Sequence, residues 1–379
     1  MILLKIKLNS NKYFKTYLYA FATCLLSLNY ILYQVFDLVE VKTPMRVLVF
    51  SLFLLIAFIN FKHYRFGIKE IIILSLLLIT TVISSDVSNF LFLVFIAFSF
   101  REISYFKFIK IISIFNIILA SLLIVGLISG KLENRMFYSP MRVRYTLGFI
   151  GTNANAAAQF YFSVIVLYIL SARRINVINL FIIIFLLLIL FYFTDTRSLI
   201  FVTIIGCGIY LMVKNINSNI SILLTMLLGL LFFHAFFISF LNQLLPQLNV
   251  YSSGRILKYF NLISTWNLFN LLFGGVPNQL ESFYLSFVSY HGLLILISIF
   301  FLTKRTIILF YRNGLYLEVS VIYALLSYGV VESSLMRPEI VAFMVYWIYI
   351  ANPRQIIREI KKEKVRRIKC DNVYPKFSV

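Results

Sequence analysis

Charged side chains are scarce in this chain. Asp, Glu, Lys and Arg together make up 13% of its 379 residues, and only 14 residues are acidic. Soluble domains are about one quarter charged, so this scarcity excludes the two or three soluble domains that the length would otherwise allow. Hydrophobic residues fill the place of the missing charge: they make up 61% of the chain, and the mean hydropathy is +0.93. Such a composition is typical of a polytopic membrane protein.

Cysteine and histidine are also few, at three residues each. Cys24, Cys207 and Cys370 are odd in number and far apart, which excludes a disulfide framework and the ligand spacing of a zinc site. The chain has no glycine-rich nucleotide fingerprint, no Ser/His/Asp arrangement and no outward-facing Asp pair for a divalent cation. We therefore expect neither a metal nor a cofactor.

Apolar runs recur along the whole chain and predict an all-α protein of about 12 transmembrane helices. No internal repeat is visible, which weakens a transporter built from duplicated halves. Residues 1–351 are predicted to form one transmembrane domain, and 352–379 a basic cytoplasmic tail. The predicted spans are 17–36, 47–61, 68–83, 88–100, 108–129, 154–170, 177–193, 199–213, 220–241, 283–302, 316–331 and 339–351.

Basic side chains orient these spans. With the N-terminus inside, the cytoplasmic segments hold 25 of the 35 Lys and Arg residues, as the positive-inside rule requires. Both termini are then cytoplasmic. The net charge of +21 is explained by these loops beside a lipid bilayer, so no nucleic-acid partner is expected. The inner loops are too short for a cytoplasmic sugar-nucleotide enzyme. Three outer segments are longer than turns: 130–153, 242–282 and 332–339.

Four arginines fall on the outer side, against the positive-inside rule: Arg142, Arg144, Arg197 and Arg255. Arginine binds phosphate oxygens through two parallel hydrogen bonds and keeps its charge at any relevant pH. The outer cluster therefore predicts the capture of an anion, and a lipid-linked pyrophosphate is the best extracytoplasmic candidate. Arginines that bind lipid headgroups are the alternative interpretation.

Neighbouring polar residues support this prediction. Asn153 and Asn155 suit a tight turn into the next helix, whose N-terminus would itself favour an anion. Asp195 could hold the guanidinium of Arg197 toward a substrate, although a simple ion pair capping the span would explain the same residues.

Glu281 lies at the outer mouth of the predicted span 283–302, where a carboxylate could take a proton from an attacking sugar hydroxyl. A solvated loop acid is the alternative. Glu332, Arg337 and Glu339 form an outer charged cluster. These residues either line the same outer vestibule as Glu281 or form ion pairs with each other.

The motifs R-V-R-Y-T-L-G-F, D-T-R-S, S-G-R and E-S-F-Y-L-S-F-V-S-Y-H-G, in this order between about 140 and 295, resemble the O-antigen ligase/polymerase superfamily. The chain is most similar there to the Wzy-type polymerases of bacterial capsular polysaccharide. Two positions depart from the family pattern: Thr152 stands where a Pro often precedes the Asn, and Glu281-Ser282 stands where the last motif begins with His or Asp followed by Asn. Ligases of the superfamily tend to carry the His, so its absence favours a polymerase.

The resemblance implies a glycosyltransferase of the GT-C type in the bacterial cytoplasmic membrane. It would join undecaprenyl-pyrophosphate-linked repeat units on the outer face, without a metal, alongside a flippase and a chain-length regulator. Arg142, Arg144, Arg197 and Arg255 would bind the pyrophosphate and Glu281 would be the base. A ligase of the same superfamily and a flippase for the lipid-linked units are the alternatives.

Overall fold

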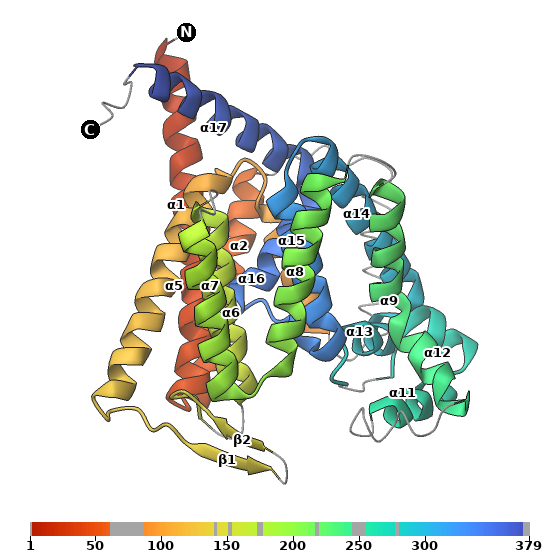
Figure 1. Ribbon diagram of the computed structural model, residues 1–379. Helices are drawn as coiled ribbons and strands as arrows, with labels where there is room; N and C mark the ends of the chain where they lie inside the picture. Colours follow the sequence, from red (N-terminus) through yellow and green to blue (C-terminus); the bar gives the residue numbers. More distant parts are fainter. Residues whose placement is uncertain are drawn as a thin grey trace.

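The protein is almost entirely helical and membrane-embedded (Figure 1). The computed structural model describes residues 2–60, 87–139, 142–150, 154–172, 177–216, 220–244, 255–276 and 280–373. The helices are α1 (Ile2–Val35), α2 (Val39–Asn60), α4 (Val87–Ser99), α5 (Tyr105–Ile128), α6 (Ala154–Ala172), α7 (Val177–Thr194), α8 (Arg197–Asn215), α9 (Ile220–Leu244), α11 (Arg255–Ser264), α12 (Leu268–Phe273), α13 (Phe283–His291), α14 (Leu293–Arg312), α15 (Tyr316–Val331), the 3₁₀ helix η2 (Ser333–Met336), α16 (Val341–Ala351) and α17 (Pro353–Val373).

Among the described residues, seven helices are long and apolar enough to cross a membrane. Three shorter apolar helices accompany them, at Phe181–Thr194, Tyr316–Val330 and Val341–Ala351. The number of 12 spans stays a prediction, because the run at 68–83 lies outside the described residues.

Helix α16 forms the centre of the bundle. Every residue from Val341 to Ile350 is buried, so this short helix touches protein on all sides, as a helix that is apolar all round should. Small residues allow the helices around it to approach closely: Gly206 on α8 faces Ala324 on α15. The segment entering α16 is fixed by Trp347, whose indole N–H donates to the Leu335 carbonyl at 2.9 Å.

The prediction of one continuous span at 283–302 is wrong, because the structure has two helices in this range. α13 ends at His291 and α14 begins at Leu293. Gly292 between them has φ +85° and ψ 161°, a conformation essentially restricted to glycine. The loop after α12 packs against this break, and a Cβ on Gly292 would overlap the Leu272 carbonyl.

A short antiparallel hairpin, absent from the all-helical expectation, follows α5. Strand β1 (Met136–Ser139) pairs with β2 (Arg142–Tyr145), with Phe137 opposite Arg144. The hairpin is closed at its base by the hydrogen bond from the Thr146 amide to the Arg135 carbonyl, 3.1 Å. Figure 1 shows the hairpin, α11 and α12 at one end of the bundle and both chain termini at the other.

The break at Gly292 generates a stability prediction. Gly292→Ala should lower the unfolding temperature markedly, because the strained backbone alone costs about 1–3 kcal/mol and the added methyl group also meets the Leu272 carbonyl. Gly208→Ala on α8 is the matched control, since no atom lies within 4 Å of a Cβ there. Thermal unfolding in detergent, followed by size-exclusion chromatography, measures both. Equal unfolding temperatures for the two variants would contradict the strained break.

Candidate functional site

The segment between α15 and α16 lies at the hairpin end of the bundle and carries Glu332, Arg337 and Glu339. Glu332 caps the C-terminus of α15 with extended backbone, φ −140° and ψ 137°. The side chains of Leu335 and Met336 in η2 are buried, so the turn is anchored in the core and its polar residues are held in place.

Glu332 is the meeting point of residues from distant parts of the chain. Its Oε1 accepts a hydrogen bond of 3.0 Å from Nδ2 of Asn155, in the first turn of α6. Its carboxylate also interacts electrostatically with the guanidiniums of Arg255, Arg337 and Arg144 and with the carboxylate of Glu281. The structure therefore gathers the predicted site residues Arg144, Asn155, Arg255 and Glu281 around an acid from the outer cluster.

This environment raises the pKa of Glu332 to about 7. Removal of water by burial is the largest cause, because it disfavours the charged form. The nearby guanidiniums of Arg255, Arg337 and Arg144 lower the pKa and the Glu281 carboxylate raises it. The side chain is only partly buried, so a desolvated carboxyl group remains within reach of an entering molecule.

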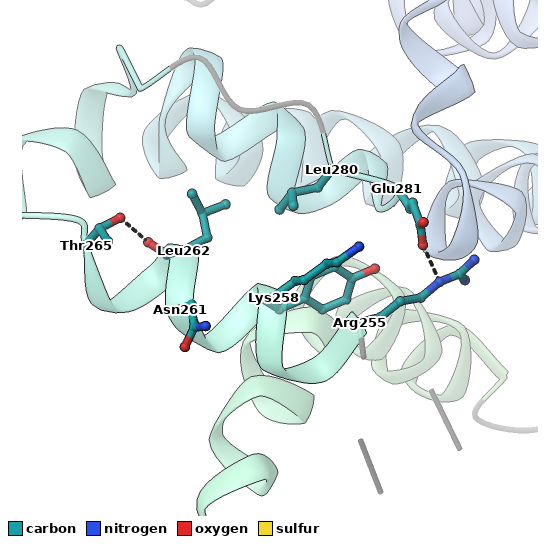
Figure 2. A pocket seen from close by; sticks show the side chains of 8 residues that line it. Arg255, Lys258, Asn261, Leu262, Thr265, Leu280 and Glu281 are labelled. Atoms are coloured by element: carbon teal, nitrogen blue, oxygen red, sulfur yellow. Dashed lines mark hydrogen bonds and ion pairs between the residues drawn. The ribbon is translucent and has the colours of Figure 1, made fainter. Parts of the chain in front are cut away.

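Arg255 and Glu281 form an ion pair between the guanidinium Nε and the carboxylate Oε2, and Figure 2 shows them at the rim of a pocket. Both side chains are partly exposed, at 38% for Arg255 and 50% for Glu281. The pocket has a volume of about 540 Å³. It is lined by Arg255, Lys258, Tyr259, Asn261, Leu262, Thr265, Leu280 and Glu281.

Amphipathicity explains why α11 presents this pocket. Ile256, Tyr259 and Leu262 recur every three residues and are buried, and two of them, Tyr259 and Leu262, line the pocket together with the exposed residues Lys258 and Asn261. Tyr259 packs with Ala235 on α9 and Leu285 on α13. Burial raises the pKa of Tyr259 to about 12, against the lowering effect of Arg255.

The loop that carries Glu281 is tied to α13 by hydrogen bonds. The Ser286 hydroxyl accepts from the Leu280 amide and donates to the Leu280 carbonyl, both at 2.9 Å. The Val276 amide donates to the Ser289 carbonyl at 3.1 Å. These bonds satisfy loop backbone groups and fix the direction from which Glu281 reaches Arg255.

Arg142 and Arg144 both lie on β2. The ring of the next residue, Tyr145, meets that of Phe193 near the end of α7 edge to face, with ring centroids 5.8 Å apart. This contact places the hairpin against the end of α7, and Arg144 of the hairpin interacts electrostatically with Glu332.

Asp195, with φ +44°, and Thr196 form the turn before Arg197, the first residue of α8. Among the ion pairs found between the described side chains, none joins Asp195 to Arg197, and the Arg197 side chain is exposed. The next residue, Ser198, lies beside the Tyr328 hydroxyl, which interacts with Glu332. The start of α8 therefore lies beside the group of charged residues around Glu332. Asn153 lies outside the described residues.

The other members of the 332–339 segment have different partners. Arg337 lies against the Tyr30 hydroxyl on α1. Glu339 is buried and accepts from Nε of Arg46 on α2 at 2.6 Å. Glu332 therefore interacts with Arg255 and Glu281 at the rim of the pocket, whereas Glu339 connects the segment before α16 to α2.

Among the described residues, no group of three or more His, Cys, Asp or Glu side chains is arranged to hold a metal ion. No protein-family model, no curated protein and no solved structure matches the chain.

The raised pKa of Glu332 has a consequence for stability. Because the folded-state pKa of about 7 exceeds the ordinary value of 4.5, ionisation of Glu332 opposes folding, and the stability lost increases as the pH rises from 4.5 through about 7. Glu332→Gln should therefore unfold at a higher temperature than wild type at about pH 8, and at nearly the same temperature at about pH 4. Glu133→Gln is the control, because Glu133 precedes the hairpin at the same end of the bundle and is exposed. A gain that does not depend on pH would contradict the assigned shift.

Proposed function

We propose that this protein is a membrane glycosyltransferase that polymerises lipid-linked oligosaccharide repeat units. The observation that carries the proposal is the convergence of Arg144 and Arg255 with Glu281, Asn155 and Glu332 at one end of an apolar helical bundle. Hydrophobic spans alone do not require such a cluster, because charge near hydrocarbon is costly and persists where it serves binding or chemistry.

A diphosphate ester suits this arrangement. Its oxygens accept paired hydrogen bonds from guanidiniums, and a site partly shielded from water strengthens the attraction. Arg144 and Arg255 both interact with Glu332, Arg142 lies on the same strand as Arg144, and Arg197 is the first residue of α8. The N-termini of α8 and α11 begin at Arg197 and Arg255, so their backbone amides add positive potential for an anion.

The reaction follows from the binding. A hydroxyl of one unit attacks the anomeric carbon of the lipid-linked chain, the carbon–oxygen bond to the pyrophosphate breaks, and a new glycosidic bond forms. The departing undecaprenyl pyrophosphate takes the electron pair, and the arginines stabilise the charge that develops on it. With an activated leaving group, positioning and electrostatics suffice without a metal. The 540 Å³ pocket beside Arg255 is available for sugars.

The excess of Lys and Arg near both termini favours a cytoplasmic position for that end of the bundle, and in that orientation the arginine cluster would face outward. The substrate's lipid would enter from the bilayer. A flippase would supply the units, and a chain-length regulator would act on the product. The proposed setting is a capsule-producing bacterium, and the architecture proposed is of the GT-C type with about 12 spans.

The arginines give one test. Arg144→Ala, Arg197→Ala, Arg255→Ala and Arg142→Ala should each strongly reduce chain extension at unchanged protein level, and Arg→Lys should rescue poorly because lysine lacks the two-pronged geometry. Arg135→Ala is the matched control, since Arg135 is exposed and paired with Glu133. Full extension by all four alanine variants would dismiss the pyrophosphate site.

Deletion of the gene separates the polymerase from its alternatives. Loss of a polymerase leaves single repeat units on undecaprenyl pyrophosphate at the outer leaflet, visible on a gel of lipid-linked glycans. Long lipid-linked chains in the deletion strain would instead identify a ligase, and single units trapped on the inner leaflet would identify a flippase.

A further inference from the structure

We propose that Glu332, rather than Glu281, is the catalytic base that takes the proton from the attacking sugar hydroxyl. This inference rests on the proposed function and adds to it the residue that activates the acceptor.

Glu281 is engaged elsewhere. Its Oε2 is paired with Nε of Arg255, and half of its side chain faces water (Figure 2). A carboxylate in this position neutralises Arg255 until a more highly charged anion replaces it. Glu281 therefore acts as a positioning residue for the arginine that receives the pyrophosphate.

Glu332 has the geometry of a base. It is partly buried, and Asn155 holds Oε1 at 3.0 Å, which fixes the plane of the carboxylate. Among the described side chains, no hydrogen bond to Oε2 is found, so this oxygen is the one available to an acceptor hydroxyl. Both ends of the Asn155–Glu332 bond are anchored, one in the first turn of α6 and the other at the end of α15.

The groups around Glu332 place the base beside the leaving-group site. Arg144 faces it from β2, Arg255 from α11 and Arg337 from the segment after η2. Glu281 contributes a like charge from the loop before α13. Among the described residues, the hydroxyls of Tyr30 on α1, Tyr328 on α15 and Tyr259 on α11 are further titratable neighbours. The carboxylate that would accept the proton and the arginines that would hold the pyrophosphate are thus neighbours in one charged cluster.

The proton balance is complete without a further reactant. The hydroxyl oxygen forms the bond to the anomeric carbon and its proton passes to Oε2 of Glu332, while the bond to the pyrophosphate oxygen breaks and the pyrophosphate leaves with the electron pair. Product release then allows the protonated Glu332 to return its proton to water. The pKa of about 7, raised by burial, suits this exchange because a base is most effective when its pKa lies near the working pH.

The experiment uses the full-length protein in nanodiscs and lipid-linked single repeat units extracted from the deletion strain. Turnover and KM are measured from about pH 5 to 9 for wild type, Glu332→Gln, Glu332→Asp, Glu281→Gln and the control Glu133→Gln. We expect wild-type turnover to rise with pH through about 7. Glu332→Gln should lose roughly 10²–10⁴-fold in turnover together with this rise, and Glu332→Asp should retain part of both. Glu281→Gln should raise the KM for the lipid-linked donor and keep the rise.

Asn155→Ala provides a measurement that does not depend on removing the acid. It deletes a hydrogen bond to the ionised carboxylate, so the rise in turnover should move to higher pH. If Glu332→Gln keeps wild-type turnover, or if Glu281→Gln abolishes the pH rise, the assignment of the base is overturned while the polymerase stands. If wild type itself does not extend the units, the proposed function fails first.

Discussion

Hydrocarbon does not solvate charge, and this constraint organises the protein. Each ionisable side chain near a span must lie at an end of the bundle or be paired, so polar residues from all parts of the chain are concentrated in two layers. At one end this produces the basic tail and the pair of Lys12 with Glu359, 2.6 Å apart. At the other end it brings Arg144, Arg255 and Glu332 together, although 188 positions separate the first from the last.

The layer of charged residues at the hairpin end of the bundle is partly self-neutralised. Glu281 and Glu332 lie among the guanidiniums of Arg144, Arg255 and Arg337, which limits repulsion between the arginines. A monovalent headgroup then gains little by replacing a carboxylate, whereas a pyrophosphate gains more because it carries more charge. The burial of Glu332 opposes folding, and the fully enclosed α16 with the clasp of Arg46 and Glu339 supplies compensating stability. Strain at a functional position is commonly offset in this way.

The sequence was sufficient to predict a helical membrane protein, because long apolar runs have few alternatives in a bilayer. The break at Gly292 could not be predicted from the sequence, because glycine is also common inside transmembrane helices and the run 283–302 is apolar on both sides of it. The hairpin at 136–145 was hidden because four-residue strands give little periodic signal. The positive-inside rule distinguishes Arg142, Arg144, Arg197 and Arg255 only by their predicted side of the membrane, not by their partners. The bond between Asn155 and Glu332 spans 177 positions, and no local pattern reports such a contact.

The break between α13 and α14 also separates the helices beside the pocket from the long apolar helix α14. α11 contacts the bundle through the apolar cluster of Ala235, Tyr259 and Leu285, Leu280 is hydrogen-bonded to Ser286 on α13, and α12 packs against the break at Gly292. Lys258 and Asn261 on the wall of the pocket beside Arg255 are exposed, so they can vary without repacking the apolar core. Under the proposed function, one scaffold would then accept chemically diverse glycans through changes at these exposed positions while the arginines that bind the pyrophosphate stay the same.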